Sequence, residues 1–152
     1  MPLELSSPAF DDGDPIPRSH GYREANASPP LALSGVPDAA ESLVLVVDDP
    51  DAVAPAGTVW DHWLVWNVDP GRTRLPEGWD PASEDAVEGT NDFGEVGYGG
   101  PDPPEGEHAY RFRAYALDAR LDLDPSADKA TLVSAMQDHV LDDAELTGTY
   151  AP

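Results

Sequence analysis

The chain contains no cysteine and few basic residues. Without cysteine, neither a disulfide framework nor a thiolate metal site can form. It has no leading basic and apolar signal segment and no long apolar run, which predicts a cytoplasmic protein without stable membrane association. Lys and Arg together number 8, and Lys129 is the only lysine. The chain therefore offers no basic patch for binding nucleic acid or an anionic membrane surface.

Acidic residues are abundant instead. The 30 Asp and Glu residues give a formal net charge of -22, and they are spread along the whole chain rather than gathered in a tail. This distribution predicts a solvated acidic surface. At molar salt the Debye length falls to about 3 Å, which screens the repulsion among such charges. The cytoplasm of a halophile is therefore the expected setting.

Length and apolar content are those of a globular protein. A chain of 152 residues with 40% hydrophobic residues predicts one domain, residues 1–152, with a sizeable core. Residues 43–47 form a continuous apolar run rich in β-branched side chains, which is typical of a strand covered on both faces. Residues 1–42 contain many Pro and Gly residues, which favour short strands and ordered loops.

Two further strands are predicted over residues 60–68 and 108–117. Alternation places Trp60, His62, Leu64 and Trp66 on one face of the first of these strands. In the second strand, alternation groups His108, Tyr110, Phe112 and Ala114. Both histidines therefore lie early in a strand and beside aromatic residues.

One helix is predicted near the C-terminus. Leu132, Val133, Met136, His139 and Val140 recur at helical spacing, and Asp124-Pro125 supplies a cap followed by a proline in the first turn. No internal repeat and no alternating series of strands and helices is visible. The fold class we predict is mostly β and antiparallel, with a few short peripheral helices.

Two segments carry the candidate chemistry. The first reads Asp49-Pro50-Asp51-Ala52 and is followed by Trp60-Asp61-His62. The second reads Asn91-Asp92-Phe93-Gly94 and passes through a Gly- and Pro-rich stretch to His108-Ala109-Tyr110. Each joins a turn to a histidine at a strand entry, where a β scaffold places side chains into a cleft. A protonated imidazole beside a carboxylate can donate charge-assisted hydrogen bonds to a phosphate.

These blocks resemble the signature motifs of the phosphatidylethanolamine-binding protein (PEBP) family, an Asp-Pro-Asp-Ala-Pro loop and a Gly-x-His-Arg strand entry. The resemblance is closest to the prokaryotic, Raf-kinase-inhibitor-like branch, and it extends from Ser7-Pro8-Ala9-Phe10 to Gly148-Thr149-Tyr150. It implies a β-sandwich-like fold and a binding protein, not an enzyme, that uses no cofactor or metal. A small anionic or phosphorylated ligand is the implied partner.

The resemblance also assigns the pocket residue by residue. The matching positions are Asp49, Ala52, Trp60, His62, Gly100, Pro103, Pro104, His108 and Tyr110, together with Asp51 of the same loop. A homodimer is compatible with the sequence, which identifies no protein partner.

The chain departs from the family pattern at three places. Val53 stands where the loop motif has its last proline, and Pro55 follows two residues later. Ala109 replaces the arginine after the second histidine, and Arg111, predicted on the same strand face, would compensate in part. Asp102 adds an acid at the rim, where a small residue is usual. These departures weaken the expectation of tight binding to a dianionic phosphate.

Other interpretations of the same residues stay open. Asp49 and Asp51 flank a proline, where turns stabilised by Asp side chains are common, and the two histidines could be packed strand residues. A metal-dependent hydrolase could use His62, His108 and either Asp49 or Asp51, since two histidines and a carboxylate form a known open ligand set. A protein-interaction module, such as a kinase or protease inhibitor, is a third class.

The charge excess generates a first prediction. The free energy of unfolding should rise steeply between dilute buffer and molar KCl, because salt screens the repulsion among the acids. Thermal unfolding followed across that range of salt checks it. A midpoint that does not respond to salt would contradict the halophilic interpretation.

Overall fold

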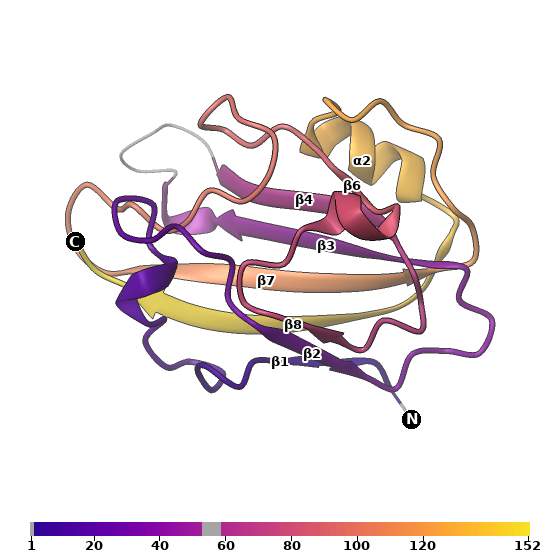
Figure 1. The fold of residues 1–152 in the computed structure, drawn as a ribbon, viewed down its shortest axis with the longest axis horizontal. Helices are drawn as coiled ribbons and strands as arrows, with labels where there is room; N and C mark the ends of the chain where they lie inside the picture. The colour runs from indigo at the N-terminus through magenta and orange to yellow at the C-terminus, as the bar shows by residue number, and fades with distance from the viewer. Residues whose placement is uncertain (1, 53–58) are drawn as a thin grey trace.

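The computed structural model describes residues 2–52 and 59–152, and in this part of the chain it shows two antiparallel sheets with an α-helix packed outside the larger one (Figure 1). The smaller sheet has the order β1-β2-β5, formed by Glu4–Ser6, Leu31–Ser34 and Arg74–Leu75. The larger sheet has the order β6-β4-β3-β7-β8, formed by Val87–Glu88, Trp60–Val68, Ser42–Asp49, His108–Leu117 and Val140–Tyr150. The predicted mostly β, antiparallel fold is confirmed.

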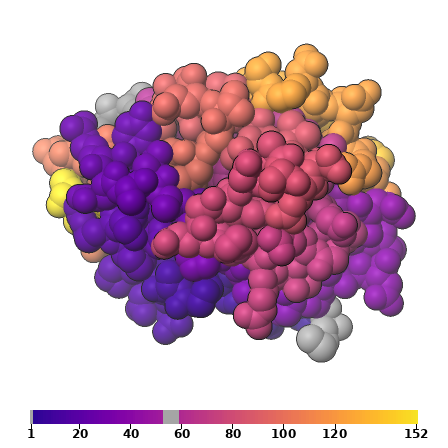
Figure 2. All heavy atoms as spheres, viewed as in Figure 1, coloured from indigo at the N-terminus to yellow at the C-terminus, as the bar shows by residue number. Residues whose placement is uncertain are grey.

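Short helices lie between the strands. The 3-10 helices are η1 (Arg18–His20), η2 (Pro50–Ala52) and η3 (Pro81–Glu84), and the α-helix α2 (Lys129–Met136) precedes β8. In the part of the chain described, no helix has the length and apolar character needed to span a membrane. The N-terminal loops and the segment that follows β4 cover much of the near face of the molecule (Figure 2).

Strand β3 is the centre of the larger sheet and is buried along its whole length. Leu43, Leu45 and Val47 belong to the core between the two sheets, whereas Val44 and Val46 belong to a second core beneath α2. A strand covered on both faces needs no polar side, which explains the continuous apolar run. The predicted strand over residues 43–47 is confirmed.

Strand β4 has the predicted bounds, but its alternation is broken. Its pairing with β3 shifts register beside Asp48, so that His62 is an extra residue in a β-bulge. His62 and Trp63 therefore both face inward, while Leu64 and Trp66 join the core beneath α2. The prediction that Trp60, His62, Leu64 and Trp66 share one face was wrong, because the bulge reverses the alternation after His62.

Strand β7 follows the predicted alternation. His108, Tyr110, Phe112 and Ala114 are buried on the inner face, and the intervening residues are half-buried on the outer face. Nothing interrupts the pairing of β7 with β3, so the period of two persists along that ladder. The side chains of His108 and Tyr110 consequently point the same way.

Helix α2 is shorter than predicted at both ends. Its N-cap is Asp128, whose carboxylate accepts a hydrogen bond from the Thr131 amide at 2.9 Å, and the predicted cap at Asp124 was wrong. The helix ends at Met136, so His139 lies beyond it and Val140 already begins β8.

Strand β8 was not predicted, and the apolar residues at its start were assigned to the helix instead. It pairs with β7 over its length but has an exposed side, with Val140 and Leu141 at 42% and 40% exposure. Acidic residues on this side conceal the strand periodicity, because they are depleted in strands generally. The helical spacing of residues 136, 139 and 140 was therefore a coincidence.

The outer face of β3 carries a buried carboxylate bound by three cations. Asp48 is fully buried, and it accepts hydrogen bonds from Arg111 at 2.8 and 3.0 Å, from Arg113 at 2.9 Å and from Lys129 at 3.1 Å. The Lys129 ammonium also lies 2.6 Å from Asp61. Burial alone would raise the pKa of Asp48, but these three cations hold it below its ordinary value. The network joins β3, β4, β7 and α2.

We predict that Asp48→Asn lowers the free energy of unfolding by about 3 kcal/mol, because it leaves three clustered cations without their anion. Chemical denaturation at fixed molar salt measures the change. Asp118→Asn is the matched control, since this acid pairs with His139 at the surface and should have a small effect. Equal losses in the two variants would show that the Asp48 network is not special.

Candidate functional site

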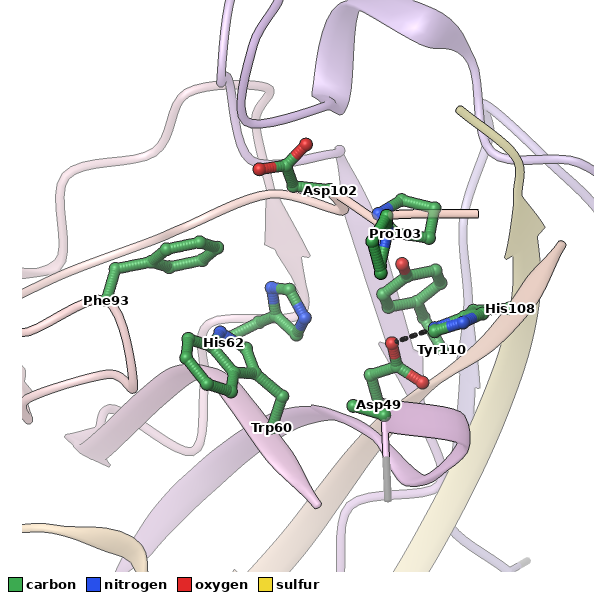
Figure 3. Close-up of a pocket in the computed structure, with 10 residues that line it drawn as sticks. Asp49, Trp60, His62, Phe93, Asp102, Pro103, His108 and Tyr110 are labelled. Atoms are coloured by element: carbon green, nitrogen blue, oxygen red, sulfur yellow. Dashed lines mark hydrogen bonds and ion pairs between the residues drawn. The ribbon is translucent and has the colours of Figure 1, made fainter. Parts of the chain in front are cut away.

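The end of β3 and the starts of β4 and β7 meet at one end of the larger sheet (Figure 1). Antiparallel pairing causes this, since Asp49 lies opposite Trp60 on one side and the neighbouring Asp48 lies opposite Arg111 on the other. A cavity of about 230 Å³ opens there (Figure 3). Its lining consists of Asp49, Ala52, Trp60, His62, Phe93, Asp102, Pro103, Pro104, His108 and Tyr110.

His108 and Asp49 form a buried pair in this cavity. His108 Nδ1 lies 2.6 Å from Asp49 Oδ2, and the two side chains are 9% and 4% exposed. The other oxygen of Asp49 accepts a hydrogen bond from the Asp51 amide at 2.9 Å, which fixes the carboxylate. Because a carboxylate accepts, Nδ1 carries the proton, and Nε2 is the ring nitrogen left to meet a ligand.

His62 is the second histidine and is also buried, at 3% exposure. Its Nδ1 donates to the Gly99 carbonyl at 2.7 Å, and the Gly99 amide donates back to the His62 carbonyl at 2.9 Å. The ring makes edge contacts with Tyr110 at 5.2 Å and Phe93 at 5.6 Å between centroids. Burial lowers the pKa of His62, although the Gly99 carbonyl and Asp49 oppose the shift. At neutral pH this imidazole is uncharged and presents Nε2 as an acceptor.

Tyr110 supplies a hydroxyl between the two imidazoles. The residue is 1% exposed, and its oxygen has no hydrogen-bond partner among the described residues. Burial first, and then the charge of Asp49, raise the pKa of Tyr110 above its ordinary value, so the phenol keeps its proton. The cavity therefore contains a neutral hydroxyl that can donate to a ligand.

Aromatic rings form one wall. Phe93 stacks on Tyr22 with centroids 4.0 Å apart and meets the edge of Trp60 at 5.6 Å. Asn91 fixes the loop before this ring, because its side-chain oxygen accepts hydrogen bonds from the amides of Phe93 at 2.9 Å and Glu95 at 3.2 Å. Sequence reasoning missed Phe93 as a lining residue, although its motif had been singled out.

The Gly-rich stretch allows close packing behind the cavity. A Cβ on Gly99 would lie 2.5 Å from the Phe93 ring, and one on Gly100 would lie 2.0 Å from the His20 carbonyl. The Gly100 amide also donates to the Asn26 side chain at 2.7 Å. Gly100 was predicted to line the pocket. It packs behind the cavity instead and is not part of the lining.

The structure thus brings together most of the predicted site residues. Those that line the cavity are Asp49, Ala52, Trp60, His62, Pro103, Pro104, His108 and Tyr110. Asp51 does not, since its carboxylate accepts from the Ala109 amide at 2.8 Å and caps the entry of β7. Val53 and Pro55 lie outside the described residues.

Two other expectations concern cations. Arg111 was expected to replace part of the arginine missing at Ala109, but it binds Asp48 on the face of the sheet that turns away from the cavity. The hydrolase alternative needs a metal, and among the residues described no group of three or more His, Asp or Glu side chains is placed to hold one.

Comparison with known proteins identifies the family and the fold. The family model for phosphatidylethanolamine-binding protein matches residues 6–151. A UPF0098 protein of Methanothermobacter thermautotrophicus is 45% identical over 97% of this chain and 98% of its own length. The crystal structure of a PEBP homologue from Chlamydia trachomatis is 42% identical, with a TM-score of 0.92, over 99% of this chain and 98% of that one. E. coli YbcL, titled a member of the mammalian PEBP family, has a TM-score of 0.90 at 32% identity and covers 100% of this chain and 99% of its own.

The burial of neutral His62 generates a pH prediction. Its folded pKa lies below the ordinary value of 6.5, so the unfolded chain takes up a proton first as the pH falls. The free energy of unfolding should therefore decrease from about pH 6.5 toward about pH 5, and His62→Asn, which keeps a donor for the Gly99 carbonyl, should make this slope shallower.

Denaturation at several pH values and constant salt measures the slope. His139→Asn is the control, because that histidine is 43% exposed outside the pocket. A slope equally shallow in both variants would remove His62 as the cause.

Proposed function

The chain belongs to the phosphatidylethanolamine-binding protein family, and from this we propose that its cavity binds a small anionic or phosphorylated ligand without turning it over. The observation that carries the proposal is the His108 and Asp49 pair at 2.6 Å, with the free hydroxyl of Tyr110 in the same cavity.

Two hydrogen-bond donors, His108 and Tyr110, line the same cavity. When His108 is protonated, Asp49 balances its charge and Nε2 becomes a second donor, which meets the ligand. Tyr110 adds a neutral donor whose proton is retained at all ordinary pH values. Hydrogen bonds to an ionised group are roughly twice as strong as those between neutral groups, so an anion benefits most from this pair of donors.

The size of the cavity and the residue types of its lining limit the kinds of ligand that it can bind. A cavity of about 230 Å³ is small for a whole lipid and suits a head group or free metabolite. Of the described lining residues, none is a Ser, Thr, Cys or Lys, so the residue types most often used as covalent nucleophiles do not line the cavity.

The proposal also covers the family branch, the cellular compartment and the partners of the protein. Relatives in an archaeon and a bacterium support placing the chain in the prokaryotic, Raf-kinase-inhibitor-like branch. The net charge of -22 supports a halophilic cytoplasm, where salt screens the acidic surface. The same charge argues against nucleic acid and stable membrane association as partners. A regulatory role would follow from ligand occupancy.

Calorimetric titration with inorganic phosphate tests the proposal. Affinity should be greater at about pH 5.5 than at about pH 8, because a histidine side chain gains a positive charge and a second donor when the pH falls through its usual range. His108→Ala should weaken binding at the lower pH by about 1.5 to 3 kcal/mol, the usual range for a hydrogen bond to a charged group.

His139→Ala is the matched control, since it removes a histidine that also pairs with an aspartate but lies at the surface. It should bind phosphate as the wild type does. Equal affinity in wild type and His108→Ala at both pH values would exclude this histidine from binding. Steady release of phosphate from a phosphate monoester would favour the hydrolase instead.

A further inference from the structure

We propose that Asn26, a residue of the N-terminal loops that does not line the cavity, is a positioning residue. It fixes the orientation of the His62 imidazole through the two peptide groups that flank the Cα of Gly99. The inference rests on the proposed function in so far as His62 meets a ligand, but the positioning itself concerns the protein alone.

Asn26 and His62 bind the two ends of one peptide group. The Gly100 amide donates to Asn26 Oδ1 at 2.7 Å, and the Gly99 carbonyl of the same peptide group accepts from His62 Nδ1 at 2.7 Å. The N–H and C=O of a trans peptide group point in opposite directions. Asn26 and His62 therefore lie on opposite sides of one planar unit, and rotation of that unit would break both hydrogen bonds.

The preceding peptide group is bound in the same way. The Gly99 amide donates to the His62 carbonyl at 2.9 Å, and the Tyr98 carbonyl of that peptide group accepts from Asn26 Nδ2 at 3.4 Å. The oxygen of the Asn26 amide thus faces a donor and its nitrogen faces an acceptor, which assigns the orientation of this side chain. Two consecutive peptide groups are held between Asn26 and His62.

This segment needs an external restraint, because glycines stand on both sides of the peptide group that meets the imidazole. Without a Cβ, the backbone of Gly99 and Gly100 has more allowed conformations than that of other residues. Close packing excludes a larger residue at either position, so the restraint has to come from hydrogen bonds. Hydrogen bonds that share a peptide group also polarise one another, which strengthens the chain from Asn26 to His62.

Asn26 is itself held in place by its own loop. Its amide donates to the Gly21 carbonyl at 3.1 Å, and its φ is 52°. Glycine adopts a positive φ without steric cost, so the backbone alone does not require an asparagine here. The buried His20 closes the loop, since its Nδ1 donates to the Ala27 carbonyl at 2.8 Å. A closed loop can hold the Asn26 amide in one direction, as positioning requires.

The consequence for the pocket is the tautomer of His62. While Nδ1 donates to the Gly99 carbonyl, the neutral ring keeps its proton on that nitrogen and leaves Nε2 as the acceptor. If the peptide group turned, Nδ1 would lose its acceptor and the ring would exchange between its two tautomers. A ligand would then meet either a donor or an acceptor at the same place.

NMR of the imidazole ¹⁵N nuclei in the ligand-free protein tests the proposal at about pH 8, where a histidine of ordinary or lowered pKa is neutral. Wild-type His62 should show the Nδ1–H tautomer alone, and His62→Asn assigns its signals. Asn26→Gly permits the positive φ and removes the side chain, so it should lose the single tautomer and show both. Asn26→Asp keeps an oxygen for the Gly100 amide and should restore the single tautomer.

Asn67→Gly is the matched control. Asn67 has a φ of 58°, and its side chain also makes two hydrogen bonds, donating to the Leu121 carbonyl at 2.8 Å and accepting from the Leu121 amide at 2.7 Å. Neither residue lines the cavity, so the His62 signals should equal those of the wild type. His108, whose Nδ1 faces Asp49, should keep its tautomer in every variant and reports that the pocket stays folded.

A single Nδ1–H tautomer at His62 in Asn26→Gly, or the same change in both glycine variants, would overturn the proposal. Loss of the fixed tautomer at both His62 and His108 in Asn26→Gly would overturn it too, because the effect would then be a general loss of structure. The spectra need no ligand. A failure of phosphate to bind would therefore overturn the proposed function alone and leave the positioning of His62 untouched.

Discussion

The buried carboxylate of Asp48 is the interaction on which the sheet and the pocket both depend. It binds Arg111 and Arg113 of β7 and Lys129 of α2 on the outer face of β3. The next residue, Asp49, points to the opposite face, because successive residues of a strand alternate, and there it holds His108. A single peptide unit therefore connects the packing of α2 to the donors of the pocket. Any shift at the end of β3 would move both.

The sequence predicts this fold where one physical signal dominates. The apolar run at residues 43–47 reflects a strand buried on both faces, and the alternation of β7 reflects a strand buried on one face. Both predictions are confirmed. The bulge at His62 could not be predicted, because an extra residue is specified by pairing with β3 and not by the sequence of β4 alone. Helix α2 was extended into β8 because an edge strand with acidic residues has little apolar alternation.

The sequence predicts which residues line the cavity better than it predicts what each of them contacts. The motifs placed His62, His108, Asp49 and Tyr110 in one cavity, since strand entries gather at one end of an antiparallel sheet. The contacts of two residues differ from the expectation. Arg111 binds Asp48, as the alternation of β7 requires, and Asp51 in the 3-10 helix η2 accepts from the Ala109 amide. Phe93 enters from a loop whose path Asn91 determines.

The basic residues are distributed unevenly between the buried network and the surface. Three of the 8 basic residues, Arg111, Arg113 and Lys129, surround one buried acid, so most surface acids are left to be screened by ions. Buried pairs are screened much less than exposed ones, so the contacts of Asp48 and Asp49 keep their strength in molar salt. The pair of Arg23 with Asp102 lies at the solvent boundary and weakens first. Screening by salt therefore acts mainly on the surface acids and leaves the buried pairs that hold β3 and His108 in place.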